Sequence, residues 1–525
     1  LEAEKEAEKG KEGEENDKDK KDKKNKDEEK LEALKIDFEG IEDRKVRLSL
    51  HSARLGGSVL SNDAQKLYYL ARYDKGTDLW VYDIKKRSAK SLTKFDRGAY
   101  GLNLSKDEKT AFVMSGGRIY SIDLNKGSKK PIVFNAKLTT DYAAEREHLF
   151  EHMWRQVQKK FYVKDLHGVD WDYYKVEYAR FLPHINNNQD FAEMMSELLG
   201  ELNASHTGCR FRSRWKHADN TASLGFFIDY EYSGQGVKIA EIMPKSPLQY
   251  GENKIFAGNV IIKINGNSLN SISDFYQELN HKTNEKIQIT YANDKGKIST
   301  KYVTPISLGQ EYSLLYKRWV NGCREKTLEL SKGKIGYVHV AGMDDGSFRQ
   351  VYEDLLGKHS DMKAVIVDTR FNGGGWLHDD LATLLDGKKY VDFVPRGQYI
   401  GSDPHEKWNK PSCVLAGEGN YSDAHAFPWV YQTLKIGPVI GMPVPGTMTA
   451  VWWENLIDKS LVFGIPQVGA IDMQGNYLEN QELQPDILIT FGGMIVSKRI
   501  KRFLRDYQPK HHWNIDAKKA TNTFF

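Results

Sequence analysis

The spacing of apolar residues changes several times along this chain of 525 residues, and that change constrains its fold more than any other feature. Alternation with a period of two predicts strands, whereas recurrence at three and four residues predicts helices. A chain of this length is also too long for one hydrophobic core. We therefore predict a multidomain α+β protein, divided into residues 1–36, 37–140, 141–221, 222–310 and 311–525.

The first two segments differ sharply in composition. Residues 1–36 are almost wholly Glu, Lys, Asp, Asn and Gly. Such a segment can bury too little apolar surface to offset the conformational entropy that it would lose on folding, so we predict a disordered charged linker. Residues 37–140 contain short alternating runs, which predict antiparallel strands. Within them Leu-Ser-Asn-Asp at 60–63 recurs as Leu-Ser-Lys-Asp at 104–107, each time before two predicted strands. This repeat is typical of propeller blades, and we predict the end of a β-propeller.

The next two segments predict a helical domain and a small β-rich domain. Phe150, Met153 and Val157 share one face at helical spacing. The order of strands and turns over residues 222–310 resembles a PDZ domain. Its segment Leu224-Gly225-Phe226 resembles the loop in which such domains bind a terminal carboxylate through backbone N–H groups, although the same residues could simply begin a strand.

From residue 311 onward strand patterns alternate with helical patterns, which predicts an α/β domain with a largely parallel sheet. Ligands of such sheets collect at the carboxyl ends of the strands. The glycine run at 373–375 and Ser422 both follow predicted strands at that edge. We therefore predict that the chemistry of the chain is located there.

The overall composition excludes several classes of function. Lys and Arg number 76 against 72 Asp and Glu, a formal charge of +4, so nothing indicates a nucleic-acid partner. Three scattered cysteines form neither a disulfide framework nor a zinc motif. No apolar run approaches the roughly 20 residues of a membrane helix, so we predict no membrane insertion. The chain starts at Leu1, which indicates a piece of something longer.

Ser422 is the candidate nucleophile because it lies at a strand-to-helix corner, after the apolar run at 412–416. Such a corner turns the hydroxyl outward. The next backbone N–H, that of Asp423, would point the same way and could stabilise an oxyanion. The alternative is a serine that only caps a helix.

The glycine run at 373–375 is the second candidate element. Glycine permits positive φ and close approach of the backbone to a ligand, so this loop could direct an N–H at a reacting carbonyl. A flexible turn is the alternative. A phosphate loop is disfavoured because the Gly-Lys-Ser/Thr ending is missing.

A serine hydroxyl needs a base, and the base needs a group that holds its tautomer. His206 is the candidate base, and Ser205 could connect its ring to the carboxylate of Glu479. Glu482 is the competing carboxylate. The ordinary alternatives are a surface histidine and exposed loop glutamates.

Taken together, these residues resemble those of the tricorn-type proteases. The resemblance extends over nearly the whole chain from about residue 37 onward. Residues 166–171 and 202–207 also resemble that family closely. The resemblance implies a catalytic tetrad of Ser422, His206, Ser205 and Glu479. It further implies oxyanion donors in the backbone N–H groups of Gly374 and Asp423, and no metal or organic cofactor.

The resemblance also implies peptide substrates, a homo-oligomer that could form a ring, and a cytoplasmic location. A removed leader upstream would instead place the protein in a periplasm. Gly373 and Asp392 are candidate substrate-binding residues, with Asp386 a second candidate acid.

Two alternatives remain. A Ser-Lys tail-specific peptidase would need a lysine soon after the serine, yet none occurs between Lys435 and Lys459, where the chain has Gly-Thr-Met-Thr at 446–449. The other alternative is a peptide-binding scaffold without catalysis.

Overall fold

A computed structural model describes residues 37–49, 52–73, 76–213, 215, 217–251, 253–491, 502, 511–515 and 520–522. The linker predicted for residues 1–36 lies outside this described part. The chain divides after Thr139 into two compact units.

The first unit contains two four-stranded antiparallel sheets, each with its strands in chain order. One consists of β1 (Arg54–Leu60), β2 (Lys66–Arg72), β3 (Thr77–Asp83) and β4 (Ser88–Phe95), and the other of β5 (Ala99–Leu104), β6 (Thr110–Ser115), β7 (Arg118–Asp123) and β8 (Lys129–Ile132). The repeated Ser-x-Asp sequence builds the same turn twice, because Ser61 Oγ donates to Asp63 Oδ1 and Ser105 Oγ to Asp107 Oδ1, both at 2.6 Å. The predicted antiparallel strands are confirmed. That these two sheets end a propeller stays a prediction.

The β-rich domain of the second unit has a sheet of order β11 (Phe226–Ile228), β12 (Val237–Ile242), β13 (Val260–Ile264), β15 (Ile287–Ala292) and β16 (Ile298–Val303). The short β14 (Asn267–Ser268) pairs with β13, and α4 (Ile272–Glu278) packs its Phe275 into the domain core. Because β11 lies at one edge of the sheet, its outer side is open to a further strand.

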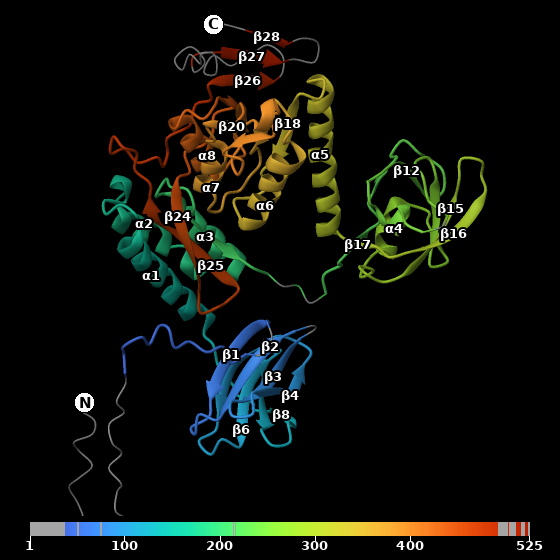
Figure 1. Ribbon diagram of the computed structural model, residues 1–525. Helices are drawn as coiled ribbons and strands as arrows, with labels where there is room; N and C mark the ends of the chain where they lie inside the picture. Colours follow the sequence, from blue (N-terminus) through green and yellow to red (C-terminus); the bar gives the residue numbers. More distant parts are fainter. Residues whose placement is uncertain are drawn as a thin grey trace, which may run out of the picture. The chain divides into compact units, whose positions relative to one another are not determined.

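A connecting helix, α5 (Leu308–Leu330), follows this domain and was not predicted. It begins directly after β17 (Ile306–Ser307), which pairs with β10 (Ala222–Ser223). Ser307 and Gln310 form a capping box that fixes the start of the helix. Farther along, α5 packs beside the first strand of the α/β domain, as Figure 1 shows in yellow.

The α/β domain contains a seven-stranded sheet, and the predicted largely parallel sheet is confirmed. Its order is β18 (Ile335–His339), β19 (Ala364–Asp368), β22 (Ser412–Ala416), β23 (Val439–Gly441), β26 (Ile487–Phe491), β27 (His511–Ile515) and β28 (Ala520–Asn522), with the last pair antiparallel. The helices α6 (Asp345–Glu353), α7 (His378–Leu385) and α8 (Asp423–Thr433) contribute Val351, Leu381 and Phe427 to its core.

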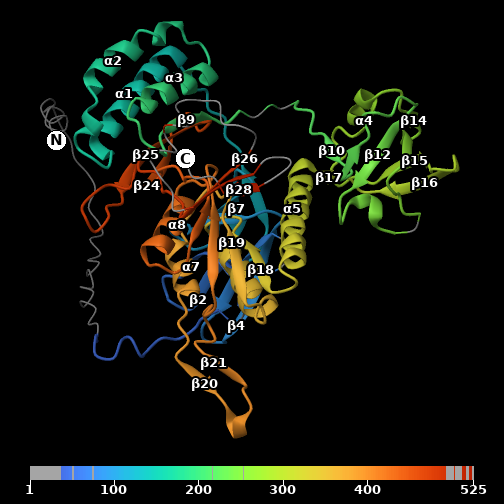
Figure 2. The same ribbon diagram turned by 90° about the horizontal axis from the view of Figure 1, so that it is seen from above.

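The helical domain is joined to the α/β domain by a shared sheet. Its helices α1 (Tyr142–Lys160), α2 (Trp171–Ala179) and α3 (Asn188–Gly200) are followed by β9 (Gly208–Phe211). This strand pairs with β25 (Leu461–Gly469), the partner of β24 (Thr449–Asn455). Phe463 of β25 lies in the same core as the three helices. The pairing of β9 with β25 therefore places the segment before β9, which contains Ser205 and His206, beside the α/β domain (Figure 2).

A separate hairpin of β20 (Val391–Phe393) and β21 (Gly401–Asp403) projects from the α/β domain (Figure 2). No described helix has the length and apolar character needed to cross a bilayer.

Candidate active site

Ser422 lies immediately before α8, at the strand-to-helix corner that the sequence predicts. Its φ of 58° and ψ of −126° are unusual for a residue with a side chain. Its hydroxyl makes no capping bond to the helix, which argues against the cap alternative. The Ser422 N–H donates to Thr447 Oγ1 at 2.8 Å. The backbone of Ser422 therefore has a strained conformation that the hydrogen bond to Thr447 stabilises, and the Ser422 hydroxyl does not cap the helix.

The glycine loop touches this corner. A Cβ at Gly374, where φ is +96°, would lie 2.6 Å from Ser422 Cβ and 3.1 Å from the Asp423 nitrogen. Only glycine allows that approach without displacing the serine. Asp423 is the first residue of α8, where a helix leaves its N–H without an acceptor of its own. The glycine loop and the Ser422 corner, which are predicted to act together, are thus in contact.

The Gly374 N–H is engaged in this structure, because it donates to Asn372 Oδ1 at 2.9 Å. The backbone of Gly373, beside it, has open space where a Cβ would be. Use of Gly374 as an oxyanion donor therefore requires that its bond to Asn372 be shared or exchanged.

Ser205, His206 and Glu479 form a connected hydrogen-bond network. Ser205 Oγ lies 2.8 Å from His206 Nδ1 and donates to Glu479 Oε2 at 3.0 Å. The Ser205 N–H donates to Glu479 Oε1 at 2.5 Å. The structure thus joins Glu479, rather than the competing Glu482, to the Ser-His pair. With Nδ1 bonded on this side, the lone pair of Nε2 is left for a proton.

His206 also contacts Tyr421, the residue before the candidate nucleophile Ser422. Its backbone N–H donates to the Tyr421 hydroxyl at 2.7 Å, and the two ring centroids are 4.8 Å apart. Within the described chain, the His206 ring and the Ser422 hydroxyl do not share a hydrogen bond. Such bonds are often long in unliganded enzymes and tighten when substrate binds.

Burial controls the charges of this network. It lowers the pKa of His206 to about 4, so the imidazole is neutral at pH 7 and able to accept a proton. It also raises the pKa of Glu479, while the bonds from Ser205 act in the opposite direction. Two buried groups connected through the Ser205 hydroxyl thus have pKa values shifted by their environment, as is common at catalytic sites.

Sequence reasoning missed the hydroxyls that support the network. Thr449 Oγ1 lies 3.0 Å from both Ser205 Oγ and His206 Nδ1. Thr447, already noted for its bond to Ser422, belongs to the same short stretch. In the sequence the notable feature of that stretch is the absence of a lysine. The two threonines occupy the region where the Ser-Lys mechanism would need its base.

The carboxylate of Asp423 was also missed, since only its backbone had been considered. It accepts bonds from His378 Nδ1 at 2.5 Å and from the Leu377 N–H at 2.5 Å. This bond to Asp423 raises the pKa of His378. The start of α8 is therefore tied to the start of α7, which follows the glycine loop.

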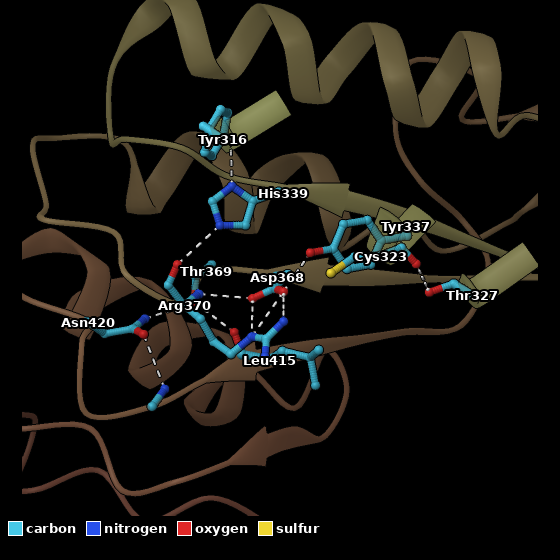
Figure 3. A network of polar contacts seen from close by, with 11 residues as sticks. Tyr316, Cys323, Thr327, Tyr337, His339, Asp368, Thr369, Arg370, Leu415 and Asn420 are labelled. Carbon is cyan, nitrogen blue, oxygen red and sulfur yellow. Dashed lines mark hydrogen bonds and ion pairs between the residues drawn. The ribbon is translucent and has the colours of Figure 1, made fainter. Parts of the chain in front are cut away.

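A polar network surrounds the end of β19, a few residues before the glycine loop in the chain (Figure 3). The Asp368 carboxylate, fully buried at the end of β19, accepts bonds from Arg370 and from the Tyr337 hydroxyl. His339 connects the Tyr316 hydroxyl of α5, at 2.7 Å from Nδ1, to the Arg370 carbonyl, at 3.1 Å from Nε2. These contacts fix the strand end from which residues 371–375 continue.

The structure does not bring Asp392 to these residues. It is exposed on the β20–β21 hairpin, and its carboxylate pairs with the Lys389 ammonium at 3.0 Å. Asp386 is likewise separate, at the end of α7. Neither acid contacts the tetrad within this chain, and Asp392 stays a prediction as a substrate-binding residue. Groups of three or more His, Cys, Asp or Glu suited to a metal are absent from the described residues.

Comparison with known proteins shows which families the parts of the chain resemble. Models of three domain families match the chain: the tricorn protease C1 domain at residues 142–200, the PDZ domain at 215–292 and peptidase family S41 at 334–489. The chain thus combines a tricorn protease C1 domain, a PDZ domain and a peptidase S41 domain, and it is similar to the tricorn proteases.

Relatives of the tricorn type match along most of the chain. It is 26% identical over 491 residues to a protein of Sulfurisphaera tokodaii named as a tricorn-like protease C-terminal subunit, covering 88% of this chain and 56% of that protein. It is 24% identical over 464 residues to the tricorn protease of Thermoplasma acidophilum, covering 86% and 42%. The chain thus spans about half the length of the curated relatives it matches.

The fold agrees with this assignment. A crystal structure of the tricorn protease superposes with a TM-score of 0.70 at 20% identity, covering 81% of this chain and 43% of that one. At this identity the likeness shows the fold alone.

Proposed function

We propose that this chain is a serine peptidase that hydrolyses peptide bonds in peptides or unfolded segments. The observation that carries the proposal is the contact between three distant segments: the Ser422 corner, the glycine loop and the Ser205-His206 segment. No single one of these features would distinguish a catalytic site from ordinary loops.

In the proposed mechanism the Ser422 hydroxyl attacks the scissile carbonyl carbon, and His206 Nε2 takes the hydroxyl proton. The developing oxyanion accepts hydrogen bonds from the Asp423 N–H and from the glycine loop. His206 then donates its proton to the leaving amine, which frees the first product. Water repeats the sequence on the acyl-enzyme and releases Ser422.

Ser205 and Glu479 act through the imidazole. As His206 becomes positively charged, its Nδ1–H donates to Ser205 Oγ, and Ser205 Oγ–H donates to the Glu479 carboxylate. The carboxylate stabilises the imidazolium through this intervening hydroxyl, and the bonds fix the ring orientation. Thr449 supports the same two groups.

We also propose a homo-oligomer, possible assembly as a ring and a cytoplasmic location, as the family resemblance implies. The two four-stranded sheets of the first unit support the proposal that they are the end of a propeller.

Incubation of the full chain with a mixed peptide library, followed by mass spectrometry of new termini, tests the function. We expect new termini with the native chain and none with Ser422→Ala at equal folded concentration. Peptides left intact by the native chain would favour the scaffold alternative. Cleavage retained by Ser422→Ala would contradict the proposed nucleophile.

A further inference from the structure

The PDZ-like domain has a groove, and the loop at one end of this groove differs from a loop that is free to bind a peptide carboxylate. A hollow of about 340 Å³ lies between β11 and α4 and reaches the start of α5. Its walls are mostly apolar, with Leu224, Phe226 and Phe275 among them. Since β11 is an edge strand, an extended peptide can add beside it while its side chains enter the hollow.

The backbone donor at the head of this groove is already occupied. The Gly225 N–H donates to Ser223 Oγ at 2.9 Å, and the Ser223 hydroxyl in turn donates to Glu311 Oε1 at 2.7 Å. A carboxylate from the chain itself is therefore connected, through one hydroxyl, to the loop that would otherwise bind the end of a peptide.

Glu311 also gives the groove its charge. Among the residues that line the hollow, all of which are described, it is the one acidic side chain, and none of the others is a lysine, an arginine or a histidine. A peptide terminus would bring a second carboxylate to this place. Two like charges at close range disfavour binding, whereas a cation there gains a charge-assisted hydrogen bond.

The position of Glu311 is fixed by the packing of α5. The capping box at Ser307 holds the first turn, and Leu314 Cδ1 lies 3.4 Å from where a Cβ on Gly225 would be. Farther along, Arg318 donates two bonds to the Glu241 carboxylate on β12, at 2.8 and 2.9 Å. The first three turns of the helix are thus attached to the domain that forms the groove.

We propose that this groove binds internal, extended polypeptide segments that carry a lysine or arginine side chain at the position of Glu311, and that it discriminates against free C-terminal carboxylates. Glu311 is the specificity-determining residue. The site is separate from the tetrad, so this binding does not depend on which residue is the nucleophile.

Fluorescence anisotropy with the full chain carrying Ser422→Ala tests the proposal without turnover of the probe. The probes are labelled ten-residue peptides of one apolar sequence: one with a free carboxylate at the end, one with a terminal amide, and one amidated peptide with an internal lysine. We expect the lysine peptide to bind about tenfold more tightly than the carboxylate peptide, the size of one favourable charged hydrogen bond.

Glu311→Gln should remove that preference or reverse it. The matched control is Glu325→Gln, the same change at an exposed position of the same helix outside the groove, and it should leave the preference unchanged. Tighter binding of the carboxylate peptide by the parent chain would overturn the proposal. So would an unchanged preference in Glu311→Gln, or no binding of any probe.

Discussion

At the scale of single residues, the candidate site depends on a neutral imidazole held between a hydroxyl and a backbone corner. His206 Nδ1 lies 2.8 Å from Ser205 Oγ, which leaves Nε2 for the proposed nucleophile, Ser422. The low pKa of about 4 follows from burial and has a direct kinetic consequence. The proposed base, His206, is inactive only when protonated, so peptide hydrolysis should persist to a pH below the ordinary pKa range of histidine.

We therefore expect the acid limb of the kcat/KM profile to have its midpoint below pH 6.5, the ordinary pKa of histidine. Initial rates with a fluorogenic peptide, measured in buffers of constant ionic strength, give this midpoint. A midpoint above 6.5 would mean that the charge of Glu479 outweighs burial, contrary to the present account.

Thr449→Val removes one hydroxyl and keeps the shape of the side chain. Because Thr449 Oγ1 lies 3.0 Å from both Ser205 Oγ and His206 Nδ1, we expect kcat/KM to fall by about 2- to 10-fold, the value of one neutral hydrogen bond. The matched control is Thr327→Val, which removes a hydroxyl bonded within α5. Equal rates for Thr449→Val and the native chain would show that this hydroxyl does not support the base.

At the scale of elements, the pairing of β9 with β25 places His206 beside the α/β domain. Gly464 of β25 pairs with Gly208, and a Cβ at Gly464 would lie 2.8 Å from the Trp453 ring and 2.9 Å from the His206 carbonyl oxygen. The strand can approach the histidine this closely only because residue 464 has no side chain.

Gly464→Ala should therefore destabilise the chain by about 1–3 kcal/mol, as other overpacked sites do, and lower kcat/KM by moving His206. Urea unfolding and peptide hydrolysis measure the two effects. Gly200→Ala at the end of α3, where a Cβ meets nothing within 4 Å, is the control and should not destabilise. Full activity and stability of Gly464→Ala would contradict the role given to this pairing.

At the scale of the whole molecule, one hydrophobic core of the second unit is built from segments that lie far apart in the sequence. Phe463 is fully buried among the helices of the helical domain although it belongs to the strand β25. The helical domain cannot complete its core without a hairpin some 250 residues later in the chain, so the two should unfold together.

Phe463→Ala should lower the free energy of unfolding by about 3–5 kcal/mol, the usual cost of deleting a buried phenyl ring. Hydrogen exchange measured by mass spectrometry should show faster exchange in both α3 and β24. Faster exchange confined to the β24–β25 hairpin would indicate that the helical domain is stable without it.

The sequence was sufficient to predict the local elements and the resemblance to the tricorn-type proteases, but not the contacts between distant segments. Ser422 and the glycine loop could be placed because each follows a strand of a parallel sheet, and such strand ends share one edge. The contact of His206 with Tyr421 could not be foreseen, because it depends on β9 pairing with a strand far along the chain.

The sequence also did not predict the side chains that form hydrogen bonds to the candidate catalytic residues. Thr447, in the loop before β24, and Thr449, the first residue of β24, carry no sequence signal of a role, and only the structure shows their hydroxyls beside the Ser422 backbone and the His206 ring. The helix α5 was missed because its buried face is narrow, with Val320 as its one buried residue. Its first turn nevertheless supplies Glu311 to the neighbouring groove.

Active-site labelling with a fluorophosphonate tests the central claim most directly. After the native chain reacts, peptide mapping by mass spectrometry identifies the residue that carries the phosphonyl group. We predict an adduct on Ser422, none in Ser422→Ala, and markedly slower labelling in His206→Gln and Glu479→Gln with the fold intact by circular dichroism. An adduct on another residue, or undiminished labelling of Ser422→Ala, would contradict the account.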